Sequence, residues 1–457
     1  MHAAIVGAGP TGLFTAIALA RRGHRATVVD RDAGPAPDGS WDRRGVMQFH
    51  HPHGLRQQIV EALEAELPEV RDALLAAGAA LTIVPAEGEH PSMVVGMQCR
   101  RSTFERVLRA AAVAEPGVTL VRGHADDVLR GRGRAGGVRV DGRELDADLV
   151  VNATGRSGRF ADDLRAPGTA ADCGLAYVSR QYQLLPGAER GPVNAPVGLM
   201  IRFRGYLAGV FLHDNRTVSV LIARPSTDRA LALLRTTAAF DAAVQAIPGL
   251  DAWTSPERTR PITPVLPGGH LHNTYRGQLD ADGRVALPGL VHLGDAVCTT
   301  NPTAGRGMAT SLMQAHRIVL SLAGHRGDVE AATRDFDAWC TEEIRPWFLD
   351  HLAVDADETR MWAGEDVDLS RPLGSGHIVA AARADPRLMR VVGPYLSMRA
   401  LPSSLAEAEP RAREIYAGGW RPPIPDGPTR DDLAELIAPL ASAPSRALLP
   451  HQALLPR

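Results

Sequence analysis

The chain has 457 residues, of which 45% are hydrophobic, and its formal net charge at pH 7 is −2. This length exceeds that of one ordinary compact domain, so we expect two interleaved units or one large domain with a cap. The near balance of charge gives no electrostatic reason to expect nucleic acid or an anionic membrane as a partner. All 50 basic residues are arginines, which excludes chemistry that needs a Schiff-base lysine, a P-loop lysine or a lysine that relays an oxidised halogen.

The four cysteines are scattered along the chain without C-x-x-C spacing. Cys99, Cys173, Cys298 and Cys340 are therefore expected to be reduced thiols, as is typical of a cytoplasmic protein, and we expect no metal site. The N-terminus carries no basic segment ahead of its first apolar run, unlike a secretory signal. No stretch approaches the roughly 20 apolar residues of a membrane-spanning helix, so we expect no membrane span.

The first thirty residues predict a β-α-β unit with a glycine-rich turn. Apolar runs at 2–6 and 26–29 flank an alanine-rich helical segment at 12–22, and the turn reads Gly7-Ala8-Gly9-Pro10-Thr11-Gly12. In this G-x-G-x-x-G pattern Gly7 permits the tight turn, Gly9 lets the backbone approach a pyrophosphate, and Gly12 lets helix and strand pack closely. Pro10 and Thr11 open the helix, whose N-terminus faces the phosphates.

Asp30 ends the second strand, eighteen residues after Gly12. The position suits a carboxylate that accepts hydrogen bonds from a ribose 2′-OH, with Arg31 beside it. Strand, helix, second strand and terminal acid in this order predict a dinucleotide site rather than a plain structural turn. The pattern by itself does not choose between FAD and NAD.

The rest of the chain divides into three stretches. Before residue 175 we expect a long loop over a ligand, two amphipathic helices and several short strands, at 31–58, 59–78, 101–113, 118–121, 125–129, 137–140 and 149–151. Alternating apolar residues then predict an antiparallel sheet with a helix, at 175–184, 198–203, 218–223 and 229–246. A strand at 289–293 returns the chain to the first sheet and a helix follows at 307–323. Beyond 330 the chain reads as helical, with a loosely ordered tail after Ser442.

A second motif follows the strand at 289–293. Gly294-Asp295-Ala296 and then Asn301-Pro302-Thr303-Ala304-Gly305-Arg306-Gly307-Met308 open a helix, and this pattern resembles the second FAD fingerprint of the p-hydroxybenzoate-hydroxylase-like flavoproteins. The resemblance implies that Asp295 binds the ribityl chain and that the helix start points at the flavin pyrimidine. A helix N-terminus there would stabilise the negative charge of reduced flavin. The implied contacts are Asp295, Pro302, Gly305, Arg306, Gly307 and Met308.

The resemblance, which covers about residues 1–330, also implies the fold. We expect an α/β protein with a discontinuous Rossmann-like FAD-binding domain at 1–174 and 276–330. An antiparallel-sheet substrate domain is inserted at 175–275, and a helical C-terminal region follows at 331–457.

A third motif bears on the electron source. Asn152-Ala153-Thr154-Gly155-Arg156-Ser157 resembles the middle motif of the family, where the chain crosses near the nucleotide and Gly155 contacts it. Relatives that bind NAD(P)H themselves usually carry Asp-Gly at Thr154-Gly155. The form in this chain is more similar to styrene monooxygenases, halogenases and geranylgeranyl reductases. Electrons from NADH or NADPH therefore arrive either directly or through a partner flavin reductase, and both routes stay open.

Two arginines fit the family's FAD contacts. Arg44 stands where relatives place an arginine over the FAD, and Arg101 begins the R-x-x-F helix start that meets the pyrophosphate. Their neighbours Arg43 and Arg100 compete for these roles, and each arginine could instead be a solvated surface residue.

Two further sets of residues give less specific predictions. His50-His51-Pro52-His53 lacks flanking acidic or cysteine ligands, so we discount a metal and expect that one histidine touches FAD or substrate. On the strand at 175–184, alternation places Arg180 and Tyr182 on one face and Tyr177 on the other. Any of these three side chains could line a pocket or simply cover the sheet.

The resemblance implies a flavin-dependent monooxygenase. In such enzymes reduced flavin and O₂ form a C4a-hydroperoxide, which delivers one oxygen atom to a small, largely apolar substrate by hydroxylation or epoxidation. The substrate would lie between the antiparallel sheet and the flavin, and no catalytic side chain is identified. The main alternative is an FAD-dependent reductase or dehydrogenase that acts on an alkene, and a non-catalytic redox sensor is another. A halogenase is excluded, because those relatives rely on an active-site lysine and this chain has none.

Overall fold

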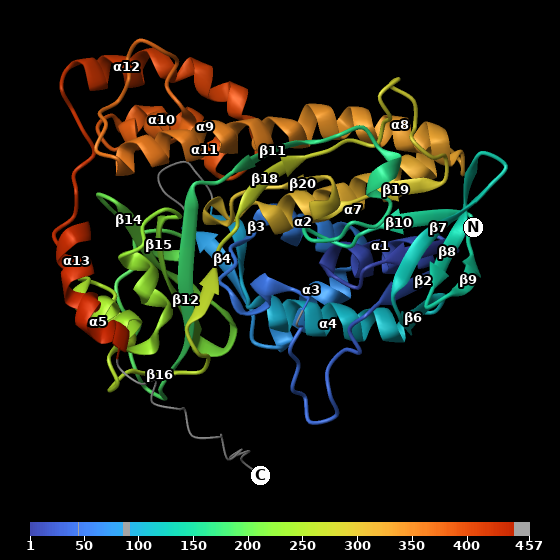
Figure 1. Ribbon diagram of the computed structural model, residues 1–457, viewed down its shortest axis with the longest axis horizontal. Coiled ribbons are helices and arrows are strands. Elements are labelled where there is room, and N and C mark those ends of the chain that lie inside the picture. Colours follow the sequence, from blue (N-terminus) through green and yellow to red (C-terminus); the bar gives the residue numbers. More distant parts are fainter. Residues whose placement is uncertain (44, 86–91, 443–457) are drawn as a thin grey trace.

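A five-stranded parallel sheet forms the centre of the nucleotide-binding half in the computed structural model, which describes residues 1–43, 45–85 and 92–442 (Figure 1). Its strand order is β19 (Leu290–His292), β10 (Leu149–Asn152), β1 (His2–Val6), β2 (Arg25–Asp30) and β6 (Val118–Arg122). Both faces of the sheet are covered around β1, β10 and β19, so nearly all of their residues are buried. The β-α-β unit expected from the first thirty residues is confirmed.

Alternate residues of β1 contact two different layers. Ala3 and Ile5 pack on the helical layer, which contains α1 (Pro10–Ala20), α4 (Arg101–Ala114) and α7 (Gly307–Gly324). Ala4 and Val6 pack on a small antiparallel sheet made of β7 (Ala125–Gly131), β8 (Arg134–Val140) and β9 (Arg143–Asp146). This period of two buries the side chains from Ala3 to Val6 between the two layers.

The predicted helix at 59–78 is in fact two helices. α2 (Gln57–Glu66) and α3 (Pro68–Ala76) are separated at Leu67, whose φ of −139° and ψ of 54° are not helical. Pro68 explains the break, because proline disfavours the helical conformation in the residue before it. Beside these helices lies a sheet with the order β3 (Leu55–Arg56), β5 (Met93–Gln98) and β4 (Ala80–Val84).

A second, antiparallel sheet faces the nucleotide-binding half. Its order is β13 (Gly198–Phe203), β14 (Tyr206–Leu212), β15 (Thr217–Pro225), β12 (Leu175–Leu184) and β16 (Thr259–Pro261), and β17 (Leu266–Gly268) also pairs with β12. The sequence did not predict β14, because all seven of its residues are buried and no polar alternation marks it. One face packs on α5 (Thr237–Ala246), which follows a 3₁₀ turn at Leu231–Arg235 and precedes α6 (Asp251–Thr254).

A three-stranded sheet joins the two halves. Its order is β11 (Thr169–Asp172), β18 (His272–Tyr275) and β20 (Cys298–Thr299). β20 lies inside the second motif, between Gly294-Asp295-Ala296 and the turn that follows Asn301, so this sheet ties that turn to both halves of the molecule.

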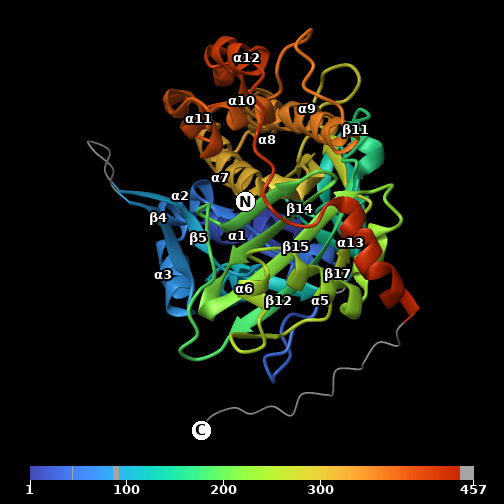
Figure 2. The same cartoon turned by 90° about the vertical axis from the view of Figure 1, so that its left-hand side faces the viewer.

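The C-terminal helices cover the nucleotide-binding half and then cross to the second sheet (Figures 1 and 2). They are α8 (Val329–Trp339), a π-helical turn at Cys340–Ile344, α9 (Arg345–Trp362), α10 (Ser375–Ala381), α11 (Met389–Leu396), α12 (Glu409–Ala417) and α13 (Arg430–Ile437). α13 lies beside α5 in both views, and Leu433 and Ile437 belong to the core of the antiparallel sheet. Two salt-bridge contacts of 2.8 Å between Arg430 and Asp228 reinforce this docking.

No helix of the described residues is long and apolar enough to cross a membrane. The tail after Ser442, predicted to be loosely ordered, lies outside the described residues.

Candidate active site

The three glycines of the first fingerprint have different surroundings. Gly7 has a φ of +112°, and a Cβ there would collide with the carbonyl oxygen of Ala153. A Cβ on Gly12 would collide with the carbonyl oxygen of Gly7. A Cβ on Gly9, in contrast, would meet nothing within 4 Å. Gly7 and Gly12 are therefore required by packing, whereas Gly9 borders open space.

The N-terminus of α1 opens into that space. Gly9 is its N-cap residue, and no described side chain caps the helix. The first N–H groups of a helix have no partners within the helix, and their dipoles favour an anion. This end of the groove suits a phosphate.

A long groove runs from α1 to the start of α7. It encloses about 1100 Å³, including space open to solvent. α7 also begins without a capping side chain among the described residues, so two helix N-termini border one groove. The predicted site residues that line it are Gly9, Pro10, Thr11, Arg101, Gly155, Asp295, Pro302, Gly305, Gly307 and Met308.

Asp30 does not line the groove. Its Oδ2 accepts the backbone N–H of Ala8 (2.6 Å) and an N–H of Arg43 (2.9 Å), and its Oδ1 accepts the N–H of Asp32 (2.8 Å). Asp30 therefore holds the glycine-rich turn against β2. Its predicted bond to a ribose hydroxyl stays a prediction, as does the role of Arg31, which is exposed and also lies outside the lining.

Of the competing arginines near the fingerprint, Arg43 is the one that the structure describes. Its side chain is 4% exposed and its Nη1 donates to Glu105 Oε2 (2.5 Å) and to the carbonyl of Ala8 (3.1 Å). Glu105, which is fully buried, also accepts from Arg101 (2.5 Å) and so directs Arg101 along the groove. The sequence analysis missed Glu105, although its spacing of four residues from Arg101 on α4 was a usable signal. The predicted FAD contact Arg44 lies outside the described residues.

Arg306 does not line the groove. Its guanidinium points away from the groove and lies 4.5 Å from the Trp347 ring centroid and 4.9 Å from that of Tyr395. Its Nη1 donates to Asp350 at 2.7 Å, and its side chain is 5% exposed. A buried cation needs a paired acid, and α9 supplies it. The Arg306 side chain therefore faces α9, and the predicted contact between this residue and the cofactor stays a prediction.

Asp295 lies in the groove as predicted. Burial raises the pKa of its carboxyl, while the nearby charges of Arg101 and Arg156 and a hydrogen bond from Ser311 oppose that rise. The sequence analysis missed the groove residues Thr300 and Ser311. Thr300 is 8% exposed and its hydroxyl has no hydrogen-bond partner among the described residues. A buried, unpaired hydroxyl in the groove fits a polar ligand such as the ribityl chain of FAD.

His51 and His53 both line the groove and are neutral at pH 7. Burial lowers the pKa of His51 to about 4 and that of His53 to about 3. His53 Nδ1 lies 2.9 Å from the carbonyl oxygen of His51, which can only accept, so Nδ1 carries the proton and Nε2 is an acceptor. His51 Nδ1 pairs with the hydroxyl of Ser179 at 2.7 Å. In the described parts of the chain no three His, Cys, Asp or Glu side chains are grouped as a metal site.

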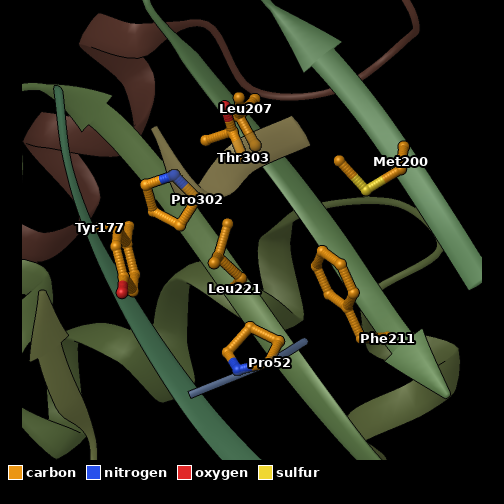
Figure 3. A pocket seen from close by; sticks show the side chains of 8 residues that line it. All are labelled: Pro52, Tyr177, Met200, Leu207, Phe211, Leu221, Pro302 and Thr303. Atoms are coloured by element: carbon orange, nitrogen blue, oxygen red, sulfur yellow. The ribbon is translucent and has the colours of Figure 1, made fainter. Parts of the chain in front are cut away.

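An apolar pocket adjoins the groove (Figure 3). Side chains of the antiparallel sheet point from neighbouring strands toward Pro52 and Pro302, and the full lining is Pro52, Tyr177, Met200, Leu207, Phe211, Leu221, Pro302 and Thr303. Tyr177 packs edge-on against His51, with ring centroids 4.8 Å apart. Burial raises the pKa of Tyr177 to about 12, so its hydroxyl stays protonated.

The predicted alternation on β12 is confirmed. Tyr177 belongs to the cluster on the pocket side, whereas Tyr182 belongs to the core on the opposite face. Arg180, on that same face, pairs with Asp241 of α5 at 2.7 Å. Only Tyr177 of the three lines the pocket.

Comparison with known proteins relates the N-terminal part of the chain to one family and finds relatives of longer stretches. Residues 2–88 match the family described as FAD dependent oxidoreductase. Protein Rv3254 of Mycobacterium tuberculosis is 26% identical over 444 residues, which cover 85% of this chain and 87% of the relative. Protein FixC of Salmonella typhimurium is 30% identical over 231 residues, covering 47% of this chain and 52% of FixC.

Solved structures share the fold at low sequence identity. The flavin-dependent brominase Bmp2 has a TM-score of 0.65 at 14% identity and covers 92% of this chain and 100% of its own. PqsL, a probable FAD-dependent monooxygenase from Pseudomonas aeruginosa, has a TM-score of 0.58 at 18% identity and covers 80% of this chain and 99% of its own. The predicted fold class is confirmed. Residues 2–88 are thus similar to the FAD dependent oxidoreductase family, and the chain shares its fold with a flavin-dependent brominase and a probable FAD-dependent monooxygenase.

Proposed function

We propose that the chain is an FAD-dependent monooxygenase that inserts one oxygen atom from O₂ into a small, largely apolar organic molecule. One observation carries the proposal: a single groove connects two uncapped helix N-termini to an apolar pocket on the antiparallel sheet. The pocket and the groove share Pro52, Tyr177, Phe211 and Pro302, so a substrate in the pocket would lie against a ligand in the groove.

The residues of the groove suit FAD from end to end. The free N–H groups at Gly9 and the guanidinium of Arg101 would bind the pyrophosphate, since a guanidinium fork matches phosphate oxygens. Asp295 and the hydroxyl of Thr300 would hold the ribityl chain. The start of α7 would face the pyrimidine and stabilise negative charge there. FAD, when bound, supplies the redox and oxygen chemistry that no side chain of the chain can provide.

The apolar pocket would hold the substrate and keep water away from the reacting atoms. Its lining contains no charged side chain, and the nearby His51 and His53 are neutral at pH 7. A charged substrate would lose its hydration there without gaining a counter-charge. The pocket therefore favours a neutral, largely apolar substrate.

The electron source is part of the proposal. We infer that NADH or NADPH is the ultimate donor and acts either by transient docking or through a partner flavin reductase. Anaerobic mixing of the FAD-loaded protein with each nucleotide distinguishes the routes, because bleaching of the flavin absorbance shows direct reduction. Without bleaching, the addition of a flavin reductase should restore turnover.

Isotope labelling tests the oxygen insertion. The FAD-loaded protein, supplied with electrons, is incubated under ¹⁸O₂ with neutral aromatic and alkene probes such as indole and styrene, and products are analysed by mass spectrometry. One ¹⁸O atom in the product supports the monooxygenase. A reduced alkene formed without O₂ would establish the alkene reductase instead, and a brominated product in the presence of bromide would contradict the argument from the absence of lysine. If the protein does not bind FAD, the proposal is refuted.

A further inference from the structure

Two acids of α9 contact residues on either side of the turn Pro302–Ala304, which lies in the second half of the second fingerprint. Asp350 pairs with Arg306, just after the turn, and Asp355 contacts Asn301, just before it. Asp355 is 5% exposed and forms no salt bridge within the described residues. Its Oδ1 accepts from Asn301 Nδ2 at 2.6 Å, and its Oδ2 accepts from Asn273 Nδ2 at 2.7 Å. The carboxyl therefore lies in a buried amide network instead of beside a cation.

This network determines which way the Asn301 amide points. An ionised carboxylate can only accept hydrogen bonds, so the NH₂ group of Asn301 must face Asp355. The amide oxygen then faces the opposite way, where it accepts from the backbone N–H of Thr303 (3.0 Å) and from its hydroxyl (2.9 Å). These bonds cap the 3₁₀ turn Pro302–Ala304. Asp355 thus acts on the conformation of the turn through Asn301, although Asp355 itself does not contact the turn.

The other side of the turn is held by Arg56. Its Nη2 donates to the carbonyl of Ala304 at 2.6 Å and its Nε to that of Gly305 at 3.1 Å. The backbone of the turn is therefore fixed from both sides, by an amide and by a guanidinium. Pro302 and Gly305 line the groove, whereas Asp355 and Asn273 do not.

The burial of the Asp355 carboxyl costs free energy. Burial raises the pKa of Asp355 to about 6, while the hydrogen bonds from Asn273 and Asn301 partly offset the rise. Buried ionisable groups with strongly shifted pKa values occur preferentially at functional sites. A network of this kind rigidifies the segment that it contacts, provided that its members are satisfied.

We propose that Asp355 is a positioning residue for the flavin: acting through Asn301, it holds the Pro302–Gly305 turn in the conformation that meets the ring. This inference rests on the proposed function, because it requires FAD in the groove. It makes α9, far along the chain, part of the flavin site.

The test compares full-length variants that differ in one carboxyl. Asp355→Asn removes the carboxylate and forces an N–H toward one of the two amides. Asp357→Asn is the matched control, since Asp357 lies on the same helix but pairs with Arg360 and Arg371, away from the turn. FAD affinity is measured by fluorescence titration, the bound flavin by its visible absorption and circular dichroism spectrum, and the apoprotein by its Tm.

Asp355→Asn should weaken FAD binding about tenfold, as expected for a lost hydrogen bond to a charged group, and should shift the spectrum of the bound flavin. Asp357→Asn should change neither by more than about twofold. Asn301→Ala should give the same spectral shift, and the double variant Asn301→Ala/Asp355→Asn should bind no more weakly than either single variant, since both belong to one pathway. Asn301→Ala also keeps the test open if Asp355→Asn does not fold.

The outcomes separate the two proposals. If the unmodified chain fails to bind FAD, the proposed function falls. If it binds FAD but Asp355→Asn has the spectrum and affinity of Asp357→Asn, or the effects at Asn301 and Asp355 multiply in the double variant, the positioning role is refuted.

Discussion

Replacement of Gly9 by alanine separates a ligand contact from a folding requirement. The residue has φ −80° and ψ 179°, an extended conformation that alanine adopts freely, and its Cβ would meet nothing within 4 Å. In the apoprotein the change should be neutral or slightly stabilising. Alanine leaves the unfolded chain fewer conformations than glycine does, which raises the free energy of unfolding by about 0.4–1 kcal/mol. The Tm of the apoprotein should stay within about 2 °C.

FAD binding should respond differently. The added methyl group projects into the groove at the point where a pyrophosphate would approach, and an extra methyl group in a close-packed contact costs about 1–3 kcal/mol. The Kd for FAD should therefore rise by about 5-fold to 150-fold. Fluorescence titration of the apoprotein measures the Kd, and differential scanning fluorimetry measures the Tm.

Gly12→Ala is the contrasting variant. Its Cβ would collide with the carbonyl oxygen of Gly7 and lie 3.3 Å from Ile5 Cγ2, so the backbone must move. We expect a loss of at least about 3 kcal/mol of folding free energy. If Gly9→Ala binds FAD as tightly as the unmodified chain, or is as unstable as Gly12→Ala, then Gly9 does not border the bound pyrophosphate as proposed.

Three further changes test other parts of the structure. Arg306→Met leaves Asp350 buried without a counter-charge, with only the Tyr395 hydroxyl still donating to it, and should cost about 3–5 kcal/mol in urea unfolding. The double variant Arg306→Met/Asp350→Leu should recover most of this loss; no recovery would refute the pairing. The folded-state pKa of Asp355 is raised from 3.8 to about 6, so its contribution to stability is full below about pH 4 and falls by roughly 3 kcal/mol as the pH rises through 6. Unfolding of the unmodified chain and of Asp355→Asn between pH 4 and 7 should show this difference, and a constant difference would contradict it. Tyr177→Phe should change apoprotein stability by no more than about 0.5 kcal/mol but should raise KM for any substrate that accepts a hydrogen bond from the phenol, and an unchanged KM would exclude that contact.

The local pattern of the sequence was enough to predict the first fingerprint. Gly7, Gly9 and Gly12 lie within one continuous strand, turn and helix. Their spacing alone therefore predicts which backbone conformations this segment adopts. The second fingerprint could be placed for the same reason, because Asp295 and the turn at Pro302 are separated by only a few residues. Strand alternation likewise placed Tyr177 on the face opposite to Arg180.

Only the tertiary structure decided which charged side chains line the groove. Arg306 stands inside the fingerprint, yet its guanidinium lies between Trp347 and Tyr395, because a buried cation goes where the fold supplies an acid. Asp355 reaches Asn301 across 54 residues, and Glu105 gathers Arg43 and Arg101 from separate elements. The sequence shows the hydrophobic period of each helix and strand. The partner of a buried charge, however, depends on which elements the fold brings together.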